Sequence, residues 1–172
     1  IAEKSSGSDD NTENLLTGAE KDAIGEVANI SMGTAATTLF SLVNNVVDIT
    51  VPKVSFATWD DLVDDYDRPC VFVQLSYIEG IEGNNVLVLK EQDVKIITDL
   101  MMGGDGQNIA DELSDLHLSA ISEAMNQMMG SSATSLSQML GRKIDISPPV
   151  ASLVDLNEGI VNKGLSEYLT ST

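Results

Sequence analysis

The sequence predicts an α+β protein with internal pseudo-twofold symmetry, in which two long helices lie side by side on one face of an antiparallel sheet. Apolar residues recur at helical spacing over about 18–44 and again over about 115–140. Strand-like patterns at 69–80 and 84–91 are joined through Gly80 and Gly83, as in a hairpin. A shift of the chain by 97 residues aligns the two helical segments without a gap. The apolar sides of both helices are therefore expected to face the sheet.

The first helix has clear start and stop signals. Thr17 followed by Glu20 is a capping-box pattern, and the pair Asn44–Asn45 is expected to end the helix. The segment 46–56 then reads as a strand, in which Pro52 indicates an edge or a bulge. The apolar residues near helical spacing in this first helix are Ile24, Val27, Ile30, Ala35, Leu39 and Leu42.

The later elements are predicted in the same way. Residues 58–67 are acidic and predict a short helix or a loop. A helix is expected over 91–104, and the glycines of "GGDG" at 103–106 are interpreted as its stop signal rather than as a phosphate loop. After the second long helix, a strand is expected at 143–155. The remainder, to Thr172, has weak helical signals.

Domain organisation follows from composition and from the repeat. Residues 1–14 contain almost no apolar anchor and predict a disordered acidic linker. Residues 15–172 are expected to form one domain, in which repeat one covers 15–110 and a partial repeat two covers 111–172.

The second repeat is expected to be truncated. Adding 97 to the hairpin at about 70–90 places its counterpart at about 167–187, whereas the sequence stops at Thr172. An exposed apolar sheet edge would follow. The alternative is that 156–172 folds back as a helix that covers the gap, because its apolar residues have helical spacing.

Charge and cysteine content exclude several classes of function. The chain has 27 acidic and 9 basic residues, a formal charge of −18, and no basic patch, which argues against binding to nucleic acid or anionic lipid. Its apolar runs are too short to insert into a membrane. A single cysteine, Cys70, cannot form an internal disulfide and fits a reducing cytosol. With His117 as the one histidine, a Cys/His zinc site is not expected.

The repeat extends to polar residues. Residues 22–52 and 119–149 are identical at 12 of 31 positions, and the matches include Glu26/Glu123, Asn29/Asn126 and Pro52/Pro149. Matching apolar positions could arise from two helices that share a period. Matching acids and amides on a polar stripe indicate a duplication.

Helical geometry gives that stripe a meaning. At 100° per residue, positions 22, 26, 29 and 33 lie within roughly 60° of one another. Each helix therefore presents a carboxylate and an amide about one turn apart, next to small residues that allow another surface to approach. One such stripe alone would favour a solvated helix face. Two copies at identical spacing favour a site.

The full pattern is Asp or Ser, then Glu four residues on, then Asn three residues on, and Pro after 22 further residues. It resembles the signature of the CheC/CheX/FliY phosphatases of bacterial chemotaxis. Together with "GEVANISMGTAATTL", "DLMMGGDG" and "EAMNQMMGSSATSL", the resemblance covers about residues 15–160 and is greatest to the flagellar motor switch members.

The resemblance implies an activity and the residues for it. Glu26, Asn29, Glu123 and Asn126 would act on the aspartyl phosphate of the response regulator CheY. Each asparagine would orient the hydrolytic water, since hydrolysis of this phosphate depends mainly on positioning. Each glutamate would pair with a lysine of the regulator. No cofactor is expected in this chain, and Mg²⁺ is expected in the partner regulator.

The resemblance also implies partners and a location. The expected partners are phosphorylated CheY and, through the full-length protein, flagellar switch proteins of the FliM and FliG kind. The expected location is cytoplasmic, at the switch complex of the flagellar basal body. The alternative is a non-catalytic structural or docking module of the switch, in which both acid/amide stripes are inactive binding faces.

Overall fold

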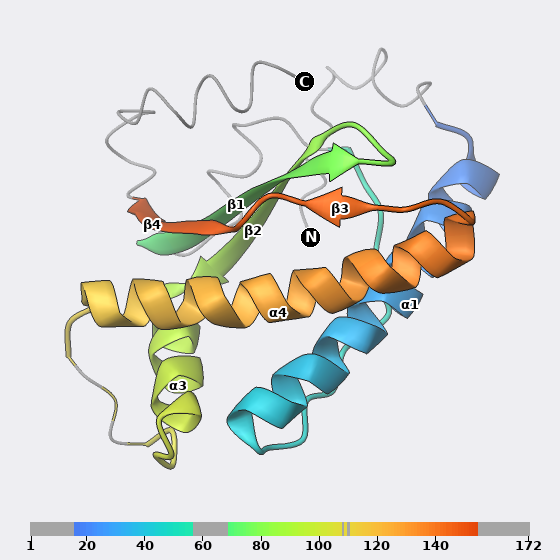
Figure 1. The fold of residues 1–172 in the computed structure, drawn as a ribbon. Helices are drawn as coiled ribbons and strands as arrows, with labels where there is room; N and C mark the ends of the chain where they lie inside the picture. The colour runs from blue at the N-terminus through green and yellow to red at the C-terminus, as the bar shows by residue number, and fades with distance from the viewer. Residues whose placement is uncertain (1–15, 57–68, 108, 110, 155–172) are drawn as a thin grey trace, which may run out of the picture.

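The helices and strands of a computed structural model form an α+β fold, with three helices on one side of an antiparallel sheet (Figure 1). The structure describes residues 16–56, 69–107, 109 and 111–154. Both long helices and the hairpin are confirmed, with bounds close to those predicted. In chain order the elements are α1 (Gly18–Val43), β1 (Cys70–Glu79), β2 (Asn84–Lys90), α3 (Glu91–Met101), α4 (Asp115–Leu140), β3 (Asp145–Ile146) and β4 (Val150–Val154).

Strand β1 is the centre of the sheet. It pairs antiparallel with the whole of β2, from Cys70 opposite Lys90 to Ser76 opposite Asn84. On its other side β1 pairs antiparallel with both β4 and β3. All pairings among the described strands are antiparallel, as the hairpin pattern predicted.

The strand predicted at 143–155 is interrupted. It forms the two short strands β3 and β4, because Pro148 and Pro149 have no backbone N–H to donate to β1. Ser147 keeps the two pieces in register. Its N–H donates to the Ser76 carbonyl at 2.8 Å, and its hydroxyl oxygen accepts from the Ser76 N–H at 2.9 Å.

The strand predicted at 46–56 is wrong. These residues form no strand and pair with no described segment. The repeat explains why. Residues 143–153 are their counterparts and pair with β1, so the partner of 46–56 would be the counterpart of β1, which begins at 167. That position, like the segments predicted at 58–67 and 156–172, lies outside the described residues.

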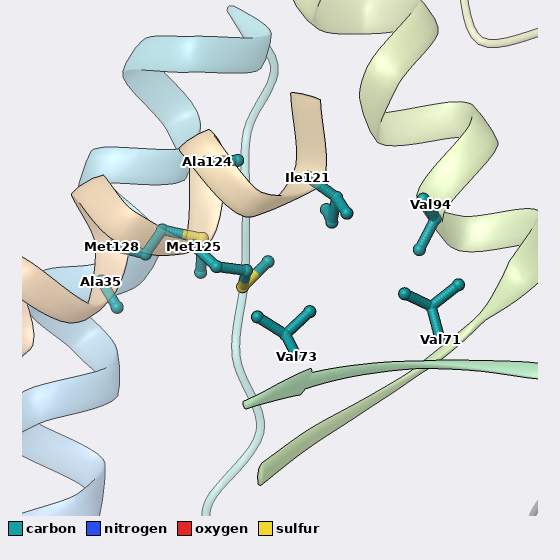
Figure 2. Packing of buried hydrophobic residues seen from close by; sticks show 8 residues of the cluster. All are labelled: Ala35, Val71, Val73, Val94, Ile121, Ala124, Met125 and Met128. Atoms are coloured by element: carbon teal, nitrogen blue, oxygen red, sulfur yellow. The ribbon is translucent and has the colours of Figure 1, made fainter. Parts of the chain in front are cut away.

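The main core lies between the helices and β1. Figure 2 shows α4 side chains pointing toward Val71 and Val73 of β1, with Val94 of α3 beside Val71. Partly buried α1 residues, among them Met32 and Leu39, pack against this cluster. All of its members are at least nine-tenths buried: Ala35, Val71, Val73, Val94, Ile121, Ala124, Met125 and Met128.

The two long helices cross in contact with each other and run in opposite directions (Figure 1). Small residues allow the close approach: Ala35 and Ala36 of α1 and Ser132 and Ala133 of α4 are all buried. The contact places the first half of α1 toward one end of the helix pair and the first half of α4 toward the other end (Figure 1).

Two residues of the predicted apolar face of α1 are exposed. Ile24 and Ile30 are 44% and 43% exposed, whereas Ser31 is buried. The repeat again supplies the reason. Ile121, the counterpart of Ile24, is completely buried in the core formed with β1 and α3. The counterpart of β1 that would cover Ile24 would start at residue 167, outside the described residues.

The "GGDG" sequence is a helix stop, as predicted. α3 ends at Met101, and Gly103 and Gly106 take positive φ angles of 88° and 73° that favour glycine. The Gly106 N–H donates to the Asp99 carboxylate at 2.8 Å, which closes the turn.

Candidate functional site

The first acid/amide pair lies in the first half of α1, just after a well-formed helix start. The Thr17 N–H donates to the Glu20 carboxylate at 2.7 Å, and the Glu20 N–H donates to the Thr17 hydroxyl at 3.3 Å. This capping box fixes the first turn of the helix. Glu26 and Asn29 follow in the next turns.

A shallow groove of about 400 Å³ contains both members of this pair. Glu26 is exposed and Asn29 is half-buried. The opposite wall of the groove is the segment that follows α1, so Pro52 of the signature lines the same groove as the acid and the amide. The lining residues are Lys21, Asp22, Gly25, Glu26, Asn29, Val51, Pro52, Lys53 and Val54.

The second acid/amide pair lies in the first half of α4. Glu123 and Asn126 are both exposed, while Met125 and Met128 on the other side of the helix are buried in the core. Pro149 of the signature is buried at the start of β4. For α4, the expectation is therefore confirmed: its acid/amide stripe faces solvent and its apolar side faces the core.

The start of α4 has a cap that the sequence did not reveal. The Ser114 N–H donates to His117 Nδ1 at 3.0 Å, and the Ser114 hydroxyl lies 2.7 Å from the same atom. His117 occupies the place that a glutamate takes in a capping box. It therefore has a structural role at the helix start.

The two asparagines share one feature. In the part of the chain that the structure describes, neither the Asn29 nor the Asn126 side-chain amide forms an intramolecular hydrogen bond. Each amide keeps its donors and its acceptor for a water or a bound partner. The chemistry thus available is that of an oriented carboxamide beside a carboxylate, presented on a rigid helix.

The two glutamates differ. The Gln127 amide donates to the Glu123 carboxylate at 2.8 Å. The counterpart of Gln127 in the first repeat is Ile30, and Glu26 accepts no hydrogen bond from the described residues. The motif alone does not show this difference. A comparison of the positions at which the two repeats are not identical would have found it.

The two pairs do not form one joint site. Because α1 and α4 run in opposite directions and each pair lies in the first half of its helix, the pairs are placed toward opposite ends of the helix pair (Figure 1). The structure thus separates Glu26 and Asn29 from Glu123 and Asn126, as expected for two independent sites.

Fold and site together define a class of protein: a duplicated α+β domain that displays the same acid/amide pair on two helices. The CheC-like family matches the chain twice, at residues 20–56 and 116–153, which are the two copies of the repeat. The chain belongs to the CheC-like family.

Three known proteins show which members it is similar to. The chain is 49% identical over 143 residues to the flagellar motor switch phosphatase FliY of Bacillus subtilis, a match that covers 83% of this chain and 38% of that protein. It is 27% identical over 153 residues to the CheY-P phosphatase CheC of the same organism, covering 86% of this chain and 72% of CheC.

A solved structure agrees with these matches. The crystal structure of Thermotoga maritima FliY superimposes with a TM-score of 0.78 at 46% identity, covering 87% of this chain and 78% of that one. The chain spans about two fifths of the length of Bacillus subtilis FliY. Among the described residues, no helix has the length and apolarity needed to span a membrane.

Proposed function

We propose that this chain dephosphorylates the aspartyl phosphate of the response regulator CheY, and that it does so at the flagellar motor switch. One observation supports this most. The same glutamate and asparagine are presented to solvent on two helices, at the same spacing, with both amides unpaired within the described residues. The relatives named as phosphatases support the reaction type.

In this proposal the asparagines perform the chemical role. An aspartyl phosphate is hydrolysed when a water lies in line with the phosphorus–oxygen bond, so a catalyst mainly has to position that water. The unpaired amide of Asn29 or Asn126 can hold the water through its oxygen and contact the phosphoryl group through its NH₂. A helix side chain is well suited to insertion into a partner's pocket because its backbone is rigid.

The glutamates perform the positioning role. Glu26 and Glu123, one turn before the asparagines, would each accept hydrogen bonds from a lysine of the regulator and so fix the register of the helix against it. The proposal assigns Mg²⁺ to the partner regulator and no cofactor to this chain. It also assigns the chain a cytoplasmic location and, through the full-length protein, contact with FliM- and FliG-like switch proteins.

Loss of the amides tests the proposal. Asn29→Asp combined with Asn126→Asp keeps the side-chain size but removes both NH₂ groups. We expect phosphoryl loss from a labelled, phosphorylated CheY to fall close to the uncatalysed rate. The free energy of unfolding should change by less than about 0.5 kcal/mol, since both sites lie at the surface.

A matched control is Gln138→Glu, which makes the same amide-to-acid change at an exposed position near the end of α4. This variant should keep its activity. Near-full activity in the double asparagine variant would show that the assignment of these residues is wrong. Binding of phosphorylated CheY without any hydrolysis by the wild-type chain would favour the alternative, a docking module of the switch.

A further inference from the structure

The first groove differs from its counterpart in charge. Lys21 and Lys53 line the groove that holds Glu26 and Asn29, one from α1 and one from the segment opposite. Neither ammonium group forms an ion pair within the described residues. Lys21 instead lies over the ring of Phe56, 5.2 Å from its centroid.

The second repeat has no such cations. The counterpart of Lys21 is Leu118, and the counterpart of Lys53 is Val150, which is 64% exposed. Asp22 is likewise replaced by Ser119. The positions that correspond to Lys21, Asp22 and Lys53 are therefore apolar or neutral in the second repeat, and the Glu123 carboxylate already accepts a hydrogen bond from Gln127.

This contrast matters in a chain with a formal charge of −18. A phosphoryl group is an anion, and it is repelled by an acidic surface. Two unpaired lysines beside Asn29 offset the charges of Asp22 and Glu26 and can contact phosphate oxygens directly. Salt weakens this attraction, because exposed charges farther apart than the Debye length, about 10 Å at 0.1 M salt, are largely screened from each other.

We infer that the two sites bind a phosphorylated partner by different means. Lys21 and Lys53 make binding at the first site electrostatic and sensitive to ionic strength. The second site has the exposed Val150 in place of Lys53, while Leu118, in place of Lys21, packs against the core, so this site binds through apolar contact and responds little to salt. This inference rests on the proposed function, and it assigns Lys21 and Lys53 as specificity-determining residues of the first site.

Two single-site chains separate the contributions. Glu123→Ala with Asn126→Ala leaves the first site, and Glu26→Ala with Asn29→Ala leaves the second. The probe is CheY loaded with beryllofluoride, a stable phosphoryl mimic, and the readout is its dissociation constant between about 0.05 and about 0.5 M salt. We expect the constant to rise steeply with salt for the first site and only slightly for the second.

Lysine variants then assign the effect. In the first-site chain, Lys21→Gln with Lys53→Gln should weaken binding at low salt by about three- to tenfold and flatten the salt dependence. Lys143→Gln is a control for the loss of a lysine away from the groove: it removes one positive charge near the β1–β2 turn, where Lys143 pairs with Glu79. It should leave both sites unchanged. Val150→Lys in the second-site chain should introduce a salt dependence there.

Equal salt slopes at the two sites, or an unchanged slope after both lysines are removed, would overturn the inference. Absence of binding at both sites would overturn it as well. Hydrolysis by the wild-type chain, followed in parallel, tests the proposed function separately. If hydrolysis persists while the two sites show equal salt dependence, the inference is wrong and the proposed function stands. If the wild-type chain does not hydrolyse the phosphate, the proposed function is wrong.

Discussion

The Thr38 and Ser131 hydroxyl oxygens lie 2.7 Å apart, where α1 and α4 cross. Under the 97-residue shift, Ser131 is the counterpart of Thr34, one turn before Thr38. The hydrogen bond therefore joins turns that are offset by one between the two repeats. It is a polar contact beside the apolar packing of the two helices.

Loss of this bond should weaken the crossing. Thr38→Val keeps the side-chain volume but removes the hydroxyl, while Ser131 keeps its bond to the Met128 carbonyl at 2.8 Å. We expect the free energy of unfolding to fall by about 0.5–1.5 kcal/mol, measured by urea denaturation. Thr37→Val is the control, because Thr37 is exposed and its hydroxyl donates, among the described residues, only to the Gly33 carbonyl of its own helix. Equal effects at the two positions would contradict this role.

The turn between β1 and β2 is predicted to tolerate no side chain at Gly80. A Cβ there would collide with the Lys143 carbonyl oxygen, and φ is already positive at 88°. Gly80→Ala should therefore destabilise the fold by more than about 2 kcal/mol. At Gly83, φ is also positive but nothing lies within 4 Å of the added Cβ, so Gly83→Ala should cost only about 1 kcal/mol. Urea denaturation measures the loss of unfolding free energy in both variants. Gly80→Ala combines a collision with backbone strain, whereas Gly83→Ala has backbone strain alone.

The capping box of α1 predicts a pH dependence. Hydrogen bonds from the Thr17 N–H and then from the Thr17 hydroxyl lower the pKa of Glu20 below 4.5. A lowered folded-state pKa stabilises the fold above the unfolded-state pKa, and this stabilisation is lost as pH falls through the folded-state value. The difference in unfolding free energy between wild type and Glu20→Ala should be full at neutral pH and should shrink below 4.5. A difference that stays constant down to acid pH would contradict the assignment.

The pair Ile24 and Ile121 tests the environments of the two repeats. Ile121→Ala should cost about 2–5 kcal/mol, because it opens a cavity between α4, β1 and α3. Ile24→Ala makes the same change at the counterpart position, where the side chain is 44% exposed, and should cost less than half as much. Thermal or urea unfolding measures both. Equal losses would mean that Ile24 is as well packed as Ile121.

The sequence predicted the helices, the hairpin and the exposure of Glu26 and Glu123 because each depends on local signals. Caps, periodicity and turn glycines are local. The strand predicted at 46–56 failed for a non-local reason: strand residues become a strand only where a partner supplies hydrogen bonds. The predicted burial of Ile24 and Ile30 was wrong for the same reason, because helical spacing identifies the apolar face of a helix but not the element that covers it.

The site was predictable to a similar degree. Duplication of Glu26 and Asn29 as Glu123 and Asn126 was visible as a spacing, because one helical turn converts sequence distance into spatial proximity. Lys53 could not be placed by that argument. It reaches the groove from the segment after α1, and only the structure brings that segment back beside the helix.

The break between β3 and β4 also limits what can attach to this side of the sheet. No described segment pairs with the outer edge of these strands, and such an edge is a template for unwanted polymerisation. Because neighbouring residues of a strand direct their N–H groups to opposite edges, two consecutive prolines also leave this outer edge without one of its donors. The two residues that divide the strand thus also make this edge a poorer partner for another chain, and we expect their replacement by residues with an N–H to raise the tendency to aggregate.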